Sequence, residues 1–254
     1  MNNKIYLLAI GCLLLATSCK KAVETSSVQI SQKELSNCQK VSCPQIDIEY
    51  VTVKSDTKAS EKINAEIQNF IIASLSIGEK EGKNSASTIE KAMKDFISLY
   101  RTHSAEFPGL SAEYFAEISV QEKYSNKEVF SISCQNYLYT GGAHGYGAVS
   151  FLNFNPQTGK QLYYEDVFEN VSDFEALAEK LFRQQQEIPK EGSINATGFW
   201  FEDDRFYLPE TFGISKEFIT LQYNQYDIAS YAAGPIVVEI PIARVNDLLT
   251  ISVE

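Results

Sequence analysis

Hydrophobic and polar residues alternate along several stretches of the chain. Ile46, Ile48 and Tyr50 are separated by acidic residues, and the same period of two runs through residues 114–120 and 130–138. Because successive side chains of a strand point to opposite faces, this pattern predicts strands with one buried and one wet face. Similar runs cover 146–154, 161–164 and 236–240, and residues 205–208 with 217–223 indicate a hairpin. Turn sequences at 125–127, 141–145 and 155–159 separate the central runs, which favours an antiparallel meander.

Three other segments carry apolar residues at helical spacing, near 60–75, 87–103 and 172–187. Ser87 with Glu90, and Ser172 with Glu175, fit capping boxes at the starts of the second and third segments. A helix with one apolar stripe has to bury that stripe against another element. The predicted fold class is therefore α+β, an antiparallel β-sheet meander packed against about three helices.

The pattern divides the chain into four parts. Residues 1–18 have the features of a lipoprotein signal peptide, and residues 19–44 lack periodicity and are rich in Ser, Lys, Gln and Glu. Such a composition is typical of a flexible tether. We expect an N-terminal α+β domain over 45–150 and a C-terminal α+β domain over 151–254, packed together as one unit.

The start of the chain predicts where the protein is located in the cell. Lys4 precedes an apolar segment from Ile5 to Ala16, which has signal-peptide length and is short for a membrane span. The segment ends in Ala-Thr-Ser before Cys19, and small residues before such a cysteine resemble a bacterial lipobox. That resemblance implies cleavage before Cys19 and acylation of this cysteine, so that acyl chains hold the protein on a lipid bilayer. We expect a lipid-anchored protein of the bacterial cell envelope, on its periplasmic or its surface face.

The remaining cysteines fit an exported protein. Cys38 and Cys43 form a close pair, and an oxidising compartment permits a disulfide between them. Cys134 occupies an inward position of a predicted strand, which favours a buried small hydrophobe over a nucleophile.

The charge of the chain limits its partners. It has 22 basic and 33 acidic residues, a net charge of -11, and loss of Lys4 with the signal peptide leaves 21 against 33, or -12. An acidic protein is a poor partner for nucleic acid and for anionic membrane surfaces, and we expect no nucleic acid. The charge would suit a basic protein partner, but simple solubility is the preferred explanation, because net charge acts on solubility first.

Two histidines, His103 and His144, restrict the enzymatic chemistry that the sequence can support. Zinc hydrolases need several histidines at close spacing, and the sequence has no such motif, so we expect no metal and no cofactor. His103 ends a predicted helix, where the helix dipole favours a cation. A cell-wall hydrolase or deacetylase that uses His144 with a nearby carboxylate is the alternative function. Carboxylates are candidates by residue type alone: Glu165, Asp166, Glu202, Asp203 and Asp204.

A glycine-dense turn at 141–145 and a tyrosine-rich segment at 226–231 are the candidate ligand-binding positions. They contribute Tyr139, Gly141, Gly142, His144, Tyr226, Asp227 and Tyr231. Consecutive glycines permit positive φ, and tyrosines are frequent binding anchors. The alternatives are structural roles. His144 would act as a turn lock, a side chain that stabilises the turn by a hydrogen bond to a backbone carbonyl, and the tyrosines would pack against the sheet.

Five short motifs resemble a known family. They are YTGGAHG at 139–145, NPQTG at 155–159, DVF at 166–168, YDIASYAAGP at 226–235 and Ile240-Pro241. Their order is similar to that of the RsiV-like extracytoplasmic module, which pairs domains of unknown function 4163 and 3298, and the resemblance extends from about residue 44 to the C-terminus. It implies a secreted or tethered α+β module that binds lysozyme as the outer part of an anti-sigma factor in one branch and precedes a peptidoglycan deacetylase domain in another.

This chain departs from the anti-sigma branch, because we identify neither a cytoplasmic segment nor a transmembrane helix in it, so the ligand of that branch does not transfer automatically. The leading hypothesis is an exported, lipid-anchored binding module that recognises a protein, such as a lysozyme-like one, or a cell-wall fragment.

Overall fold

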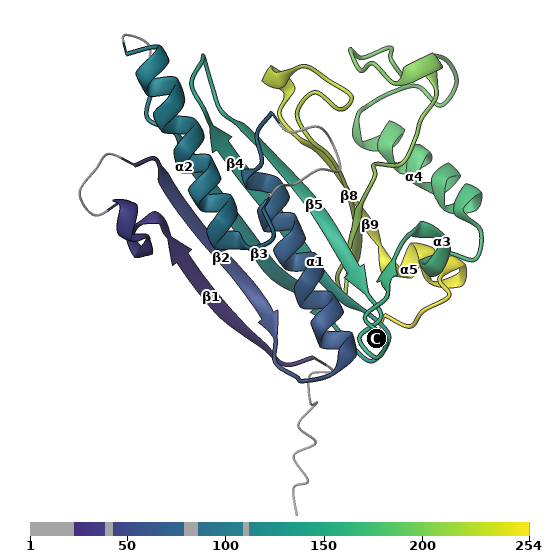
Figure 1. Cartoon of the computed structure of the whole chain (residues 1–254). Coiled ribbons are helices and arrows are strands. Elements are labelled where there is room, and N and C mark those ends of the chain that lie inside the picture. Colours follow the sequence, from purple (N-terminus) through teal and green to yellow (C-terminus); the bar gives the residue numbers. More distant parts are fainter. Residues whose placement is uncertain (1–22, 39–42, 79–85, 109–111, 254) are drawn as a thin grey trace, which may run out of the picture.

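The computed structural model describes residues 23–38, 43–78, 86–108 and 112–253, and within them it shows an α+β fold with two sheets (Figure 1). The larger sheet has six strands in the order β1-β2-β3-β4-β5-β6, and the smaller has the order β7-β8-β9. The larger sheet contains Thr25–Ser31 (β1), Gln45–Val53 (β2), Phe115–Ser125 (β3), Phe130–Tyr139 (β4), Tyr146–Phe154 (β5) and Gln161–Leu162 (β6). The smaller sheet contains Phe212–Ile214 (β7), Phe218–Tyr223 (β8) and Ile236–Pro241 (β9). The α-helices are Lys58–Leu75 (α1), Ile89–Glu106 (α2), Tyr164–Val167 (α3), Val171–Gln185 (α4) and Ile242–Val245 (α5).

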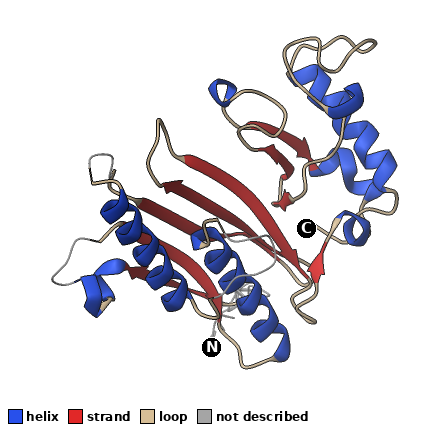
Figure 2. Ribbon diagram, turned by 45° about the horizontal axis from the view of Figure 1, so that its top comes forward, coloured by secondary structure: helices blue, strands red, loops and turns tan. Residues whose placement is uncertain are grey.

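The larger sheet is mostly antiparallel, but the expected meander is wrong at one pair of strands. Strand β2 runs parallel to β3, with Ile46 opposite Ala116 and Ile48 opposite Ile118. Helices α1 and α2 lie between these strands in the chain and side by side across the sheet (Figures 1 and 2). Both helices run back along the sheet, because α1 begins beside the 155–159 turn, where β2 ends, and α2 ends beside the 141–145 turn, near the start of β3. The chain therefore re-enters the sheet at the end where β2 began, and β3 has the same direction as β2.

The main core lies between these two helices and the larger sheet. Ile63, Ile67 and Ile71 of α1 are fully buried, as are Phe96 and Ile97 of α2. The alternating residues of β2, β3 and β4 that the pattern assigned to the inner face are buried against them. The periodicity therefore identified the covered face of the sheet correctly.

The predicted helix starts were one or two residues from the true ones. Thr88, rather than Ser87, caps α2 and accepts a hydrogen bond from the Lys91 backbone N–H, and Asn170 caps α4 instead of Ser172. The cap residue has extended backbone angles, and which neighbour adopts them depends on how the preceding loop enters the helix.

The expected tether over 19–44 is a second correction, because its described part is folded. Thr25–Ser31 forms the edge strand β1 and pairs antiparallel with β2, with Thr25 opposite Val53. The pattern of this strand is weak because its polar residues suit an edge, while Val28 and Ile30 pack partly against the core. The signal peptide over 1–18 and Cys19 lie outside the described residues.

The second half of the chain forms a smaller core beside the first. Strand β7 lies on the face of the larger sheet opposite α1 and α2: Asn153 Nδ2 donates to Phe212 O (2.7 Å) and Ile214 N donates to Ser131 Oγ (3.1 Å). Helix α4 covers the smaller sheet near β9 (Figures 1 and 2). The boundary that we set between residues 150 and 151 falls inside β5, so the larger sheet extends past it.

The predicted hairpin of the smaller sheet is also corrected. Residues 205–208 form no strand, and β8 pairs with Phe212–Ile214 across a turn at 215–217. Gly213 permits this pairing close to the larger sheet, because a Cβ there would meet Phe151 Cδ1 at 2.7 Å.

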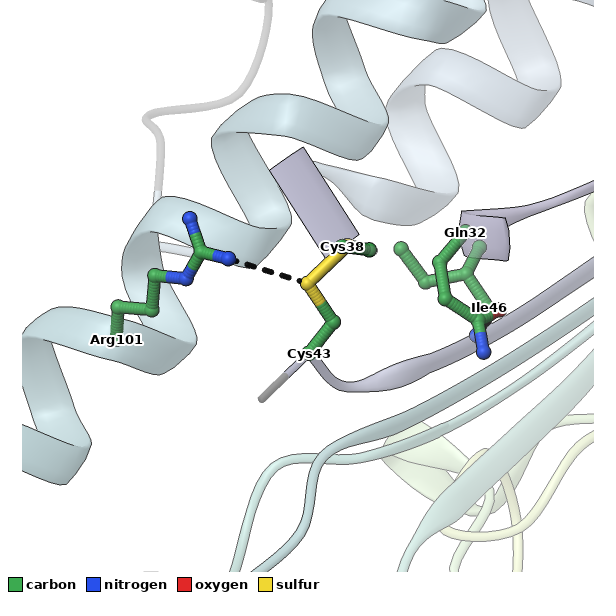
Figure 3. The surroundings of a disulfide bond; sticks show 5 residues. All are labelled: Gln32, Cys38, Cys43, Ile46 and Arg101. Carbon is green, nitrogen blue, oxygen red and sulfur yellow. Dashed lines mark hydrogen bonds between the residues drawn. A yellow bond between two sulfur atoms is a disulfide. The ribbon is translucent and has the colours of Figure 1, made fainter. Parts of the chain in front are cut away.

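Cys38 and Cys43, the pair that we singled out, form a disulfide with their Cα atoms 5.6 Å apart. The Arg101 Nη2 of α2 donates to Cys43 Sγ at 3.2 Å, so the bridge sits against that helix (Figure 3). Cys134 is a free thiol, fully buried in β4. None of the helices in the described part of the chain is long and apolar enough to cross a bilayer.

Candidate functional site

The fold brings the glycine turn and the 224–231 segment together. The side chain of Asn224 donates to Val149 O (3.0 Å) and accepts from Val149 N (2.8 Å), which fixes the start of this segment on β5. Tyr146 Oη donates to Gln225 O (3.5 Å) and Tyr231 Oη donates to Gly145 O (3.3 Å). Two groups of candidate residues that are far apart in the sequence therefore share one surface.

His144 packs on the second segment through its ring. Its centroid lies 3.9 Å from that of Tyr231, with the planes 22° apart. His144 Nδ1 lies 2.9 Å from Gly145 O, and because a carbonyl can only accept, Nδ1 carries the proton and Nε2 is the free ring nitrogen of the neutral form. Within the described residues these contacts of His144 are with a ring and a backbone carbonyl, as expected of a turn lock, and involve no carboxylate.

The glycines of the turn have different physical roles. Gly141 and Gly142 have φ of 96° and 94°, which side chains with a Cβ rarely adopt. Tyr139 Oη donates to Gly142 O (3.0 Å) and closes the turn. Gly145 is required for space, since a Cβ there would lie 2.7 Å from Leu138 O and collide with the Tyr137 ring.

Four exposed aromatic residues belong to residues 225–228 or are hydrogen-bonded to them, and we call them the aromatic surface: Tyr146, Trp200, Tyr207 and Tyr226. They are 42%, 47%, 39% and 51% exposed, which is high for such large rings. Tyr146 Oη donates to Gln225 O, Tyr207 Oη to Asp227 O (3.2 Å) and Trp200 N to Ile228 O (3.0 Å). One short segment thus holds all four positions.

This segment has a tight backbone. Asp227 Oδ2 accepts from Asn224 N (2.6 Å), Asp227 N donates back to Asn224 O (3.1 Å), and Tyr226 between them has a φ of 73°. A bulky residue in the left-handed region costs free energy and is often found at functional positions. Asp227, a candidate from the sequence, therefore closes a loop that presents Tyr226. A 3-10 turn follows at Tyr231–Ala233.

The electrostatics keep the phenols of this surface protonated. Burial, and secondly the charge of Asp227, raise the pKa of Tyr146 above its usual 10.0. The pKa of Tyr207 is raised by burial, then by Asp227 and Glu202. Both hydroxyls therefore remain hydrogen-bond donors through the physiological range of pH.

Three of the five acidic candidates, Asp166, Asp203 and Asp204, have side-chain partners in the structure. Asp166 pairs with Lys160, whose hydrogen bond lowers the pKa of that carboxyl. Asp204 accepts from Ser193 Oγ (2.6 Å), which lowers its pKa in the same way. Asp203 pairs with Arg205 (3.2 Å). Across the described ranges, no group of three or more histidines, cysteines or carboxylates is arranged to hold a metal ion.

A hollow of about 350 Å³ lies beside the glycine turn, at the end of α2. His103, Tyr114 and Gly142 are among its lining residues, and His103 Nδ1 is hydrogen-bonded to Tyr114 Oη (2.6 Å). Sequence reasoning missed the proximity of His103 to the turn. It also missed Trp200 and Tyr207, for which the one available signal was the aromatic density of residues 199–207.

Comparison with known proteins places two family models on the chain. Residues 165–243 match DUF3298, a protein family of unknown function, and residues 37–146 match deacetylase PdaC. No protein matches in the search of curated proteins. The 4163 part of the resemblance and its link to RsiV stay predictions.

Solved structures share the fold. A DUF3298 family member from Bacteroides fragilis is 22% identical with a TM-score of 0.67, and the match covers 91% of this chain and 95% of that one. A DUF3298 family protein from Pseudomonas aeruginosa is 16% identical with a TM-score of 0.62, at the same coverage. These likenesses show that the fold is shared over 91% of this chain.

Proposed function

We propose that this protein is an exported binding module of the bacterial cell envelope, anchored to a lipid bilayer through acylated Cys19. It recognises a protein or a cell-wall fragment through the aromatic surface. One observation carries the proposal: residues 225–228 bring together four exposed aromatic residues, and the hydroxyls of Tyr146 and Tyr207 are bonded to this segment. Large exposed rings are characteristic of recognition sites rather than of ordinary surface.

The hydrogen bonds of the surface favour binding energetically. Tyr146 and Tyr207 are each tied to a backbone carbonyl through their hydroxyl, so their rings are oriented before a ligand arrives. Immobilising a flexible side chain on binding costs about 0.5–1.5 kcal/mol, and a ring that is already fixed avoids most of that cost. Contact with such rings, rather than bond-making, is the chemistry that this surface offers.

A lysozyme-like protein is the first ligand to test. Lysozymes are often basic, and the net charge of -11 on this chain favours association with a basic protein. The resemblance to the RsiV-like module points to the same ligand. Cell-wall fragments are the second, because sugar rings stack on exposed aromatic side chains, and sugar hydroxyls can donate to the Tyr146 and Tyr207 oxygens, whose own protons bind backbone carbonyls.

Calorimetry tests both ligands, with the protein starting at Lys20 titrated with lysozyme at low and moderate salt and with soluble peptidoglycan fragments. We expect binding at micromolar protein, and Tyr207→Ala and Tyr226→Ala should weaken it about tenfold or more, as truncation of an interface anchor does. Tyr163→Ala is the matched control, because Tyr163 is 54% exposed but lies before α3, in a different part of the chain. The proposal would be overturned if neither lysozyme nor the peptidoglycan fragments bind, or if Tyr163→Ala loses as much affinity as the two tyrosine variants.

The single tryptophan, Trp200, gives an independent readout for the fragments, which have no tryptophan of their own. Its emission should shift when a ligand covers the aromatic surface. Fragments that bind by calorimetry without any shift in emission would place the site elsewhere.

Deacetylation or hydrolysis of the cell wall is the second candidate function. The observation that favours it is the match to deacetylase PdaC over residues 37–146, a range that includes His144. The free Nε2 of His144 would act as the base. Release of acetate or of reducing ends from peptidoglycan, lost in His144→Ala, would support this reading, whereas activity that persists in the variant removes His144 from it.

A further inference from the structure

The folded domain begins very close to the predicted lipid anchor. Val23 is 6% exposed, the Glu24 carbonyl accepts from Lys54 N (2.8 Å), and Thr25 already pairs with Val53 in the sheet. Four residue steps separate Cys19 from Val23. Even fully extended, they span at most about 14 Å, so no long tether is available.

This link enters the domain at one particular end of the larger sheet, which we call the anchor end. Val53 is the last residue of β2, and the paired residues Ser125, Phe130 and Phe154 mark the same end of β3, β4 and β5. The first turn of α1 is also there, because a Cβ on Gly159 would meet Ala59 Cα at 2.9 Å. Lys62 Nζ donates to Thr158 O (3.5 Å) across the same contact.

The charge at the anchor end differs from that of the chain as a whole. Exposed lysines at this end include Lys54, Lys58, Lys62, Lys123, Lys127 and Lys160, and carboxylates there include Glu24, Asp56, Glu61, Glu122, Glu128, Glu165 and Asp166. Lysines are therefore more frequent relative to carboxylates among these residues than in the whole chain, which has 22 basic against 33 acidic residues. Lys20 and Lys21 in the link add two positive charges beside the anchor. These lysines reduce the repulsion between this end of the acidic protein and anionic headgroups.

The aromatic surface lies at the opposite end. Tyr139 ends β4 and Tyr146 begins β5, and residues 224–231 contact this end through Val149 and Gly145. The ten residues of β4 span about 30 Å at roughly 3.3 Å each. The anchor and the aromatic surface are thus separated by the length of the sheet.

From this arrangement we propose that the anchor end rests on the headgroups of the bilayer and that the aromatic surface faces away from it. The inference depends on acylation of Cys19, which is part of the proposed function. The anchor end contacts the same bilayer into which the acyl chains of Cys19 are inserted. Partners then approach from the aqueous side, at a roughly fixed height above the membrane.

The test uses the full lipidated protein in vesicles of phosphatidylethanolamine and phosphatidylglycerol, with a fluorophore on one introduced cysteine at a time. Lys58→Cys and Lys127→Cys place it at the anchor end, and Thr140→Cys and Ala143→Cys at the far end. Cys134 is buried and Cys38 is bridged to Cys43, so the dye attaches to the introduced thiol. Lipids with a quencher on the headgroup should quench the first pair several-fold more strongly than the second.

A lengthened link provides the control. An insertion of about 20 Gly and Ser residues after Lys21 has an r.m.s. reach of about 25 Å, so the difference in quenching between the two ends should be lost. Equal quenching at both ends without the insertion overturns the orientation while the anchoring stands. Failure of the protein to float with vesicles, with Cys19→Ser behaving identically, overturns the anchoring and the orientation together.

Discussion

His144 stacks on Tyr231 with the two ring centroids 3.9 Å apart, although one residue closes the β4–β5 turn and the other lies between β8 and β9. The Tyr231 hydroxyl donates to Gly145 O beside the stack. The larger sheet and the smaller one are therefore joined at the end that carries the aromatic surface. A joint of this kind keeps the two halves of a recognition surface in register.

Two substitutions at Tyr231 separate the parts of this joint. Tyr231→Phe removes the hydrogen bond and should lower the free energy of unfolding by about 1 kcal/mol. Tyr231→Ala also removes the stack and should cost about 1 kcal/mol more. Urea unfolding at neutral pH measures both, and equal losses in the two variants would show that the stack contributes nothing.

Substitutions at Tyr226 should separate stability from binding. Its φ of 73° is unfavourable for any residue with a Cβ and costs glycine nothing. Tyr226→Gly should therefore be more stable than Tyr226→Ala by about 1 kcal/mol, while both lose ligand affinity because both lack the ring. Thermal unfolding and calorimetry on the two variants check this. An alanine variant as stable as the glycine variant would mean that the loop relaxes to a negative φ.

Removal of β1 should damage the fold, in contrast to the tether that the sequence predicted. A chain that starts at Gln32 lacks β1 and leaves the edge of β2 unpaired, but it keeps the Cys38–Cys43 bridge. Loss of buried Val23 and of partly buried Val28 and Ile30 should cost at least about 3 kcal/mol. The exposed edge should also promote aggregation.

Urea unfolding of this chain, compared with one that starts at Lys20, measures the loss. Equal stability of the two chains would show that the residues before Gln32 contribute nothing to folding, as expected of a flexible tether.

The buried thiol of Cys134 should make stability fall at alkaline pH. Burial raises the pKa of Cys134 from 9.0 to about 12, so the folded protein keeps the thiol neutral while the unfolded chain ionises it. Below pH 9 the Cys134 thiol is mostly protonated in both the folded and the unfolded protein, so it has little effect on stability. As the pH rises from about 9 towards 12, the free energy of unfolding falls progressively. Between pH 8 and pH 9.5 this group should remove roughly 0.8 kcal/mol.

Cys134→Ala lacks this ionisation, so its free energy of unfolding should fall less over the same interval. Parallel pH dependences of the two proteins would show that the Cys134 thiol ionises equally easily in the folded state.

Local patterns predicted much of the secondary structure. Ala116, Ile118 and Val120 alternate with polar neighbours, and they are buried in β3 because a strand presents alternate residues to the core. The isoleucines of α1 recur every four residues and lie on one buried face. The hairpin over 205–223 was misplaced, since Arg205–Leu208 is rich in aromatic residues yet makes no strand pairing.

The sequence by itself determined which residues face the core of the larger sheet, where the long helices lie and which chemical groups a ligand could meet. These properties follow from periodicities of two and 3.6 within a single element. The tertiary structure decided that β1 is a strand, because a polar edge strand exists only through its pairing with β2. It also decided that Tyr146, Trp200 and Tyr207 come together as one surface. These residues are hydrogen-bonded to backbone carbonyls of residues 225–228. Every residue has a backbone carbonyl, so the sequence does not reveal which ones are used.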